Sequence, residues 1–533
     1  MINTKGIFFL DLFRYKKIVK TYGNILREYI LGNKNCISIV LSVKVPGISS
    51  EKQLYLPEEF SDEDLCQYLS DYVKSDDVNF MFIDAIWHLP SGIPIPDELR
   101  LEAKRKYEVC FNELIENGNC IRHDLELIYN EEQEKEVIVE KNDEKLRFFY
   151  SIDWLNQTLD YPSILNNFIY IFNFVDAQEM RVQHVSQKTE TGTIEGLFLP
   201  DVPKHYSENS AFHVKNSLAQ LQIGSYYQFL KKHNVRLENV LEWFFTEYLQ
   251  KEFNCAPMRL FLPSEGTTFA EKCLLICASM ESALKQYTLY VEHNAVDFGL
   301  ITISSCTRDL ANIPSLVKRK YVYGDGSEFD KICYLLFSDQ SPLIYVKRYS
   351  EQGKHYRSLI SLLHQEEVYV SDYNEVELYL NYLHFLQSLG LIIIESNERI
   401  MLPRSWERHI LLDLYVNGVV SKGYYPDEAS VVFDKLSGQK LIREKSSLLS
   451  DNESSFFNYM LNHAEFDNGY DLRNLYAHGA LLVELDENIH RENYFRLLRL
   501  FVLLAIKIND DFCLRDIQKQ REAKPCPISS PKT

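Results

Sequence analysis

The stretch GYDLRNLYAHG occupies residues 469–479 and lies between two glycines. The pair Asn468-Gly469 has the backbone freedom that a tight turn requires. Asp471 can cap the backbone amides that follow it, or interact favourably with the positive end of a helix dipole. These residues predict a turn and, after it, a helix that begins near Leu472.

Three polar side chains fall in the first two turns of this expected helix: Arg473, Asn474 and His478. Asn474 and His478 are four residues apart and share one helix face, and the long side chain of Arg473 reaches the same end. We expect Leu475 to point elsewhere and to anchor the helix in the core. The N-terminal end of a helix is also a favourable place for a phosphate group.

These groups suit the cleavage of RNA without a metal ion. The reaction needs a base for the proton of the ribose 2′-hydroxyl, an acid for the leaving 5′-oxygen, and positive charge near the phosphoryl oxygens. His478 can serve as base or acid, and Arg473 offers forked donors to the phosphate. Asn474 can orient His478 or hold a phosphoryl oxygen. One copy supplies one good proton carrier, which favours a dimer that brings two sets together.

The pattern Arg473-Asn474-x3-His478 resembles the R-x4-H signature of HEPN-domain ribonucleases. The preceding turn and a long apolar helix expected at 491–508 agree with that family. The segment FAEKCLLICASMESAL, residues 269–284, also resembles the first long helix of Apea-like, defence-associated HEPN domains. A glutamate lies late in that helix in the family, and Glu281 occupies the corresponding place here.

The resemblance implies a helical bundle that forms a homodimer with a composite, metal-independent endoribonuclease site and no cofactor. Relatives act in antiphage abortive infection or as toxins that cut RNA. In this chain the N-terminal part would receive a phage-derived or cellular trigger. A second class of function stays open: a non-catalytic HEPN-like protein that dimerises or binds a partner.

Each candidate residue also has a purely structural interpretation. Arg473 can bond to a neighbouring carboxylate, His478 can be an ordinary exposed side chain, and Glu281 can form a structural ion pair. Tyr476 is expected in the core or at a dimer contact. Three other histidines show no metal-ligand spacing and are expected to be structural: His205, His213 and His463.

Length, charge, cysteine content and apolar segments limit the possible domain number, nucleic-acid binding and location of the protein. A chain of 533 residues is expected to form two to four domains. Its net charge of −19 argues against a broad surface for long nucleic acid and restricts RNA contact to a small cationic pocket. The 11 cysteines include no C-x-x-C pair, which suits reduced thiols. No segment approaches about 18 consecutive apolar residues, so we expect a cytoplasmic protein that does not span a membrane.

The pattern along the chain predicts an α+β protein in three parts. Residues 1–230 predict a mixed α/β domain with a sensor or regulatory role. Residues 231–515 predict a mainly helical, HEPN-like domain. Residues 516–533 predict a disordered tail.

Within the first part, helical and strand-like segments alternate. The apolar runs at 36–45 and 78–89 resemble strands, and residues 135–152 predict a hairpin. Further strand-like residues occur between 180 and 200. The helices expected around these strands cover residues 11–31, 61–73 and 97–117.

An insertion at about 300–450 interrupts the helical domain. Residues 376–403 predict a helix ended by Gly390 and then two strands, the outline of a winged-helix module. We expect packing or protein interaction rather than DNA recognition, because the polar helix face lacks Arg and Lys. That face carries Glu377, Asn381, His384 and Ser388.

Overall fold

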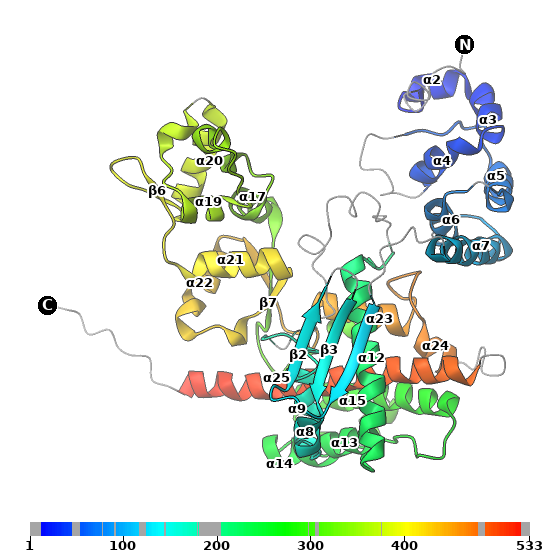
Figure 1. Ribbon diagram of the computed structural model, residues 1–533, viewed down its shortest axis with the longest axis vertical. Coiled ribbons are helices and arrows are strands. Elements are labelled where there is room, and N and C mark those ends of the chain that lie inside the picture. The colour runs from blue at the N-terminus through cyan, green and yellow to red at the C-terminus, as the bar shows by residue number, and fades with distance from the viewer. Residues whose placement is uncertain are drawn as a thin grey trace. The chain divides into compact units, whose positions relative to one another are not determined.

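The structure of the chain is a computed structural model, drawn as a ribbon in Figure 1. It is an α+β protein in which helices dominate and the described strands form small sheets of two or three strands. The residues that the structure describes are 12–44, 54–76, 78–89, 92–116, 124–142, 145–178, 180, 204–296, 298–303, 309–374, 376–477 and 486–523.

The chain folds into two compact units that interleave along the sequence, whereas the sequence predicts consecutive domains. The first unit comprises Met1–Leu155, Gly192–Val214 and Ser455–Glu484. The second comprises Asn156–Thr191, Lys215–Ser454 and Leu485–Thr533. The Arg-Asn-x3-His pattern therefore belongs to the first unit, and Glu281 belongs to the second.

The first unit begins with a helical core. The expected strands at 36–45 and 78–89 are wrong, because these residues form α4 (Ile37–Lys44) and α6 (Phe80–Trp87). A continuous apolar run lacks the periodicity that separates a buried strand from a buried helix. The predicted helices at 11–31, 61–73 and 97–117 are confirmed as α2 (Lys16–Thr21), α3 (Gly23–Leu31), α5 (Asp62–Lys74) and α7 (Asp97–Glu116).

A three-stranded sheet follows these helices in the first unit. β2 (Val137–Lys141) and β3 (Lys145–Ser151) pair antiparallel, which confirms the predicted hairpin. The sequence did not predict β1 (Asp124–Asn130), which pairs parallel with β3 and gives the order β1-β3-β2 (Figure 1). Across β1 and β3, Arg147 Nε donates to Glu126 Oε2 at 2.7 Å, so a charged pair ties the two strands together.

The second unit is built around two long helices that pack together, α15 (Phe269–His293) and α25 (Glu487–Ala523). α15 begins with a capping box: the Thr268 hydroxyl accepts from Glu271 N at 3.3 Å, and Glu271 Oε2 accepts from Thr268 N at 3.0 Å. Two helices cross from the first unit into the second: α8 (Ile152–Gln157) and α12 (Ser210–Lys232). The other helical segments of the second unit before the insertion are α9 (Tyr161–Tyr170), α13 (Leu237–Trp243), a π-helical turn (Phe244–Tyr248), α14 (Leu249–Phe253) and α16 (Phe298–Ile303).

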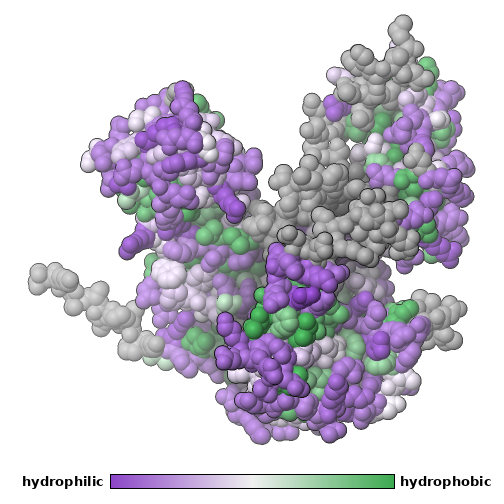
Figure 2. Space-filling view, in the orientation of Figure 1, coloured by the Kyte–Doolittle hydropathy of each residue, from purple (hydrophilic) through white to green (hydrophobic). Residues whose placement is uncertain are grey.

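The insertion has a hydrophobic core of its own within the second unit. α20 (Glu377–Ser388) ends before Gly390, which has a φ of 75°, and the two short strands β5 and β6 then pair, as predicted. A second sheet has the order β7-β4-β8. The visible surface of the insertion is mainly hydrophilic (Figure 2). Its elements are β4 (Tyr321–Gly324), α17 (Gly326–Phe337), α18 (Lys347–Ser350), α19 (Leu359–Gln365), α20, β5 (Ile393–Ile394), β6 (Ile400–Met401), α21 (Trp406–Asn417), β7 (Val419–Ser421), α22 (Asp427–Gly438) and β8 (Ile442–Lys445).

Two further expectations concern the ends of these segments. α25 continues to Ala523, so residues 516–523, expected in the disordered tail, are helical. The expected strands between 181 and 200 and the rest of the tail lie outside the described residues.

The described helices also bear on the membrane prediction. None of them is both long enough and apolar enough to cross a membrane.

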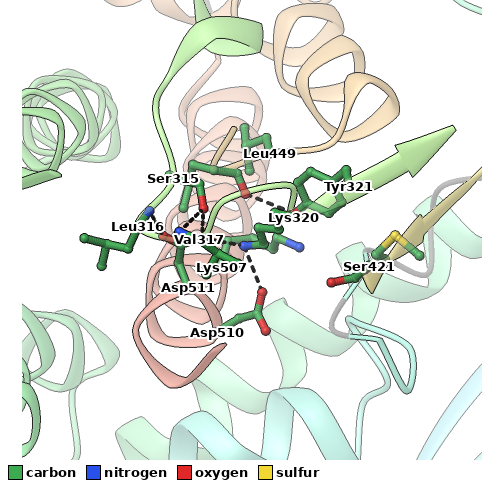
Figure 3. A network of polar contacts seen from close by, with 12 residues as sticks. Ser315, Leu316, Val317, Lys320, Tyr321, Ser421, Leu449, Lys507, Asp510 and Asp511 are labelled. Carbon is green, nitrogen blue, oxygen red and sulfur yellow. Dashed lines mark hydrogen bonds and ion pairs between the residues drawn. The ribbon is translucent and has the colours of Figure 1, made fainter. Parts of the chain in front are cut away.

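A buried ionic cluster joins the insertion to α25 (Figure 3). Lys320, the residue before β4, places its Nζ 3.0 Å from Asp510 Oδ2 and 2.8 Å from Asp511 Oδ1. All three side chains are at most 1% exposed. Burial lowers the pKa of the Lys320 ammonium, but the two carboxylates raise it by more, so the pKa lies above its ordinary value and the charge is kept.

Neighbouring groups complete the bonding of this cluster. Lys507, one turn earlier on α25, pairs with Glu453 at 3.1 Å, and both side chains are 2% exposed. The donors to the two carboxylates are Ser315 Oγ, Leu316 N and Tyr287 Oη for Asp511, and Tyr424 Oη for Asp510. The two ends of the insertion, at Lys320 and Glu453, are thus both bound to the middle of α25.

Replacing Lys320 by Met is expected to lower the free energy of unfolding by about 3–5 kcal/mol, because two buried carboxylates lose their cation. Lys318→Met is the matched control, since Lys318 lies in the same segment and is exposed; its effect should stay within about 0.5 kcal/mol. Urea unfolding of both variants measures the difference. Equal stability of the two would contradict a structural role for the cluster.

Candidate functional site

The candidate motif begins at a turn whose backbone packs too closely for any side chain at Gly469. A Cβ at that position would lie 2.7 Å from the carbonyl oxygen of Tyr459 and 3.2 Å from that of Asn462. The N–H of Tyr470 also donates to the carbonyl of Tyr459 at 2.8 Å. The turn is therefore packed directly against the end of α23 (Asp451–Leu461).

Asn468 ties the same turn to residues 204–208 of the first unit. Its Nδ2 donates to the carbonyl of Tyr206 at 3.0 Å and to Glu208 Oε1 at 3.1 Å. Its Oδ1 accepts from the N–H of Tyr206 at 2.8 Å. Since 262 residues separate Tyr206 from Asn468, no local sequence pattern could have revealed this clamp.

Titratable side chains surround the clamp. His205 Nε2 lies 3.3 Å from Asn468 Nδ2 and accepts from it in its neutral form. Burial and the nearby charge of His88 lower the pKa of His205 to about 4. Burial raises the pKa of Glu208, whose Oε1 accepts from Tyr459 Oη at 2.6 Å. Among the described residues no group of three or more His, Cys, Asp or Glu could hold a metal ion.

The motif helix, α24 (Leu472–Ala477), begins where the sequence predicts. Asp471 precedes it in the left-handed region, with a φ of 54°. Its Oδ1 accepts from the Asn474 side chain, Nδ2 to Oδ1 at 2.6 Å. The carbonyl of Asp471 accepts from Leu475 N at 3.0 Å, and its side chain holds Asn474.

Leu472 and Tyr476 anchor α24, since each is 1% exposed. They are four residues apart and share a helix face. Leu475, the predicted anchor, is only partly buried, so Leu472 and Tyr476 are the fully buried residues of α24. The burial of Tyr476 confirms that it is a core aromatic residue.

Arg473 and Asn474 are consecutive residues of α24, and the structure leaves both partly exposed. His478 lies outside the described residues, so its place stays a prediction. Glu281 lies on α15, and its Oε1 is 2.9 Å from the Nζ of Lys285, one helical turn later. This ion pair fits the structural interpretation of Glu281, and a role of Glu281 in the candidate site stays a prediction.

No known protein family, curated protein or solved structure matches this chain. The resemblance to HEPN ribonucleases therefore stays a hypothesis that depends on the motif residues and their geometry.

Gly469→Ala is expected to lower the thermal stability of the first unit, because the new Cβ meets two backbone oxygens that cannot rotate away. Overpacking of this kind costs about 1–3 kcal/mol. Gly438→Ala is the control, because a Cβ at Gly438 meets nothing within 4 Å. Thermal unfolding should show a lower midpoint for the first variant only; equal midpoints would argue against a tightly packed turn.

Acid should weaken the first unit through His205. Its folded pKa of about 4 lies below the ordinary 6.5, so the neutral form stabilises the fold above about pH 6.5 and that stability is lost as the pH falls towards 4. The loss amounts to up to about 3 kcal/mol. His205→Gln should reduce the difference in unfolding free energy between pH 7 and pH 4.5, whereas the exposed control His409→Gln should not. An unchanged pH dependence in the His205 variant would refute the assignment.

Proposed function

We propose that this chain is a metal-independent endoribonuclease of the HEPN type. The proposal is carried by one observation: Arg473 and Asn474 lie side by side and partly exposed on α24, directly after a turn that is bound on two sides. A guanidinium and an amide in that arrangement can bind one phosphodiester. His478 follows Asn474 by four residues and supplies an imidazole, the side chain best suited to act as acid or base near neutral pH.

In the proposed reaction a base takes the proton of the ribose 2′-hydroxyl, and the 2′-oxygen attacks the adjacent phosphorus. The bond to the 5′-oxygen breaks, and that oxygen gains a proton. The products carry a 2′,3′-cyclic phosphate and a 5′-hydroxyl, so no water or other reactant enters this step. Arg473 stabilises the charge that develops on the phosphoryl oxygens, Asn474 orients the phosphate or His478, and Glu281 supports the site.

The resemblance supports a role in antiphage defence, either as an abortive-infection effector or as a toxin. The chain would act in the cytoplasm as a homodimer, with the composite site formed by two motifs. The N-terminal part, whose described helices α2 to α7 share a hydrophobic core, would receive the trigger. Its separate hydrophobic core is consistent with a regulatory part.

A second candidate function is a non-catalytic interaction protein. The observation that favours it is α20, whose polar residues are exposed and include no Arg or Lys, next to Leu378 with 51% exposure. A helix face of that kind suits a protein partner better than DNA. This candidate predicts that the purified chain leaves RNA intact in the assay below.

Arg473→Ala and His478→Ala are each expected to lower the rate of RNA cleavage at least about 100-fold, because each removes a group needed only in the transition state. The assay incubates the purified chain with total RNA in EDTA and maps the cut ends. Parent cuts should carry 2′,3′-cyclic phosphates.

The matched controls are Arg105→Ala and His409→Ala, which remove exposed side chains of the same types elsewhere in the chain. Both controls should cleave RNA at the parent rate. Cleavage by the Arg473 and His478 variants as fast as by the parent would refute the assignment of the site.

A further inference from the structure

A small pocket lies in the second unit between α9, the π-helical turn and α25, with a volume of about 90 Å³. Pro162 and Asn166 line it and are exposed, so a ligand can reach it from solvent. None of the described residues that line it carries a formal charge, so it suits a neutral ligand better than an ion. The apolar and aromatic side chains of its wall include Leu165, Ile169, Trp243, Phe244, Tyr248 and Ile506.

One residue that lines the pocket has a buried polar atom without a partner. Asn509 lies on α25, and its Oδ1 is buried and accepts no hydrogen bond from the described part of the chain. A buried acceptor without a donor costs free energy, so such groups are few in folded proteins. Asn509 directly precedes Asp510, whose carboxylate lies 3.0 Å from Lys320 Nζ. The buried ionic cluster therefore fixes the backbone that carries this acceptor.

The π-helical turn builds the aromatic side of the pocket. Trp243 and Tyr248 are five residues apart, and their ring centroids lie 5.2 Å from each other. In a regular α-helix, residues five apart point about 140° away from each other and share no face. Here Leu249 N donates to the carbonyl of Phe244, five residues earlier, and this wider turn brings the two rings to one side. Phe244 stacks on Tyr248 with ring centroids 5.5 Å apart.

Packing alone does not require these features. π-helical turns are rare within α-helices and occur often at functional sites, and this one interrupts the helix between α13 and α14. Side chains that line a pocket also make fewer contacts than they would in a closed core. The unusual turn, the pocket and the unpartnered acceptor occur at one place, which is the combination expected of a ligand site.

We propose that this pocket binds a small, neutral, flat aromatic molecule that carries one N–H or O–H donor. The ring packs against Trp243 and Tyr248, and the donor bonds to Asn509 Oδ1. An apolar cavity of about 150 Å³ holds benzene, so a pocket of about 90 Å³ that reaches solvent suits a ring system that stays partly exposed. This inference is independent of the proposed function, because the pocket shares no residue with the Arg-Asn-x3-His motif.

Tyr248 also bears on the charge of the ligand. Its pKa is raised to about 12, mainly by burial, so its hydroxyl stays protonated and uncharged at neutral pH. A cation in the pocket would thus meet aromatic rings but no described carboxylate in the lining. Rings alone compensate a buried charge poorly, so a neutral ligand is favoured.

Two matched ligands test the acceptor in the full chain. Indole has a flat ring and one N–H donor, and 1-methylindole has the same ring without the donor. Ligand-observed NMR titration should give a Kd for indole on the order of 10 µM to 1 mM. 1-Methylindole should bind at least about tenfold more weakly, because Asn509 Oδ1 then stays without a donor. Tetramethylammonium, a cationic probe, should not bind.

Three variants locate the binding. Asn509→Leu keeps the size of the side chain and removes the acceptor, so indole and 1-methylindole should bind within about threefold of each other. Leu165→Trp places a large side chain in the pocket and should weaken indole binding at least about tenfold. Leu221→Trp is its control, because Leu221 is 45% exposed on α12 and does not line the pocket. Thermal unfolding shows whether each variant is folded.

Each result supports or overturns the proposal. Failure of the parent chain to bind indole at millimolar concentration would overturn it, and so would equal affinity of the parent for indole and 1-methylindole. Binding of tetramethylammonium in preference to indole would identify a cation site instead. Unchanged indole binding in a folded Leu165→Trp variant would place the binding elsewhere. If a variant does not fold, the comparison of the ligands in the parent still decides.

Discussion

The pairing of Lys320 with Asp510 and Asp511 is the interaction on which the second unit depends. An ammonium and two carboxylates are held at 1% exposure or less, and a charge buried in this way is stable only while all its partners stay in place. The cluster joins the entry of the insertion to the middle of α25, and Lys507 with Glu453 does the same at its exit. The insertion can therefore separate from α25 only if several buried charges become exposed to water at once. This constraint favours one packing of the insertion against α25.

A different kind of constraint shapes the candidate site of the first unit. The turn at Asn468 and Gly469 is held by hydrogen bonds and by close packing of backbone against backbone. Such contacts set an orientation without filling the space in front of the side chains that follow. Arg473 and Asn474 can thus remain partly exposed on a well-placed helix, a combination that binding of a phosphodiester requires.

Local sequence patterns predicted the structural features that depend on neighbouring residues, such as the start of a helix. The Asn-Gly pair and Asp471 marked the start of α24, which begins at Leu472 where the sequence placed it approximately. The apolar runs at 36–45 and 78–89 were misassigned because a nearly continuous run of apolar residues carries no period that separates a helix from a strand. The partners of Asn468 and Lys320 could not be predicted at all. They lie at least 190 residues away in the chain, and only the folded structure brings them together.

The interleaving of the two units has a consequence for how the protein is made. The turn before α24 is bonded to residues 204–208. Of these, Tyr206 is synthesised 262 residues before Asn468. At ordinary rates of synthesis this gap corresponds to a delay on the order of 10–50 s. The N-terminal segments of the first unit must wait for that time before their last partner is available. A chain that stops before Asn468 would lack the whole motif, so a nuclease of the proposed kind would stay inactive until that segment has been synthesised.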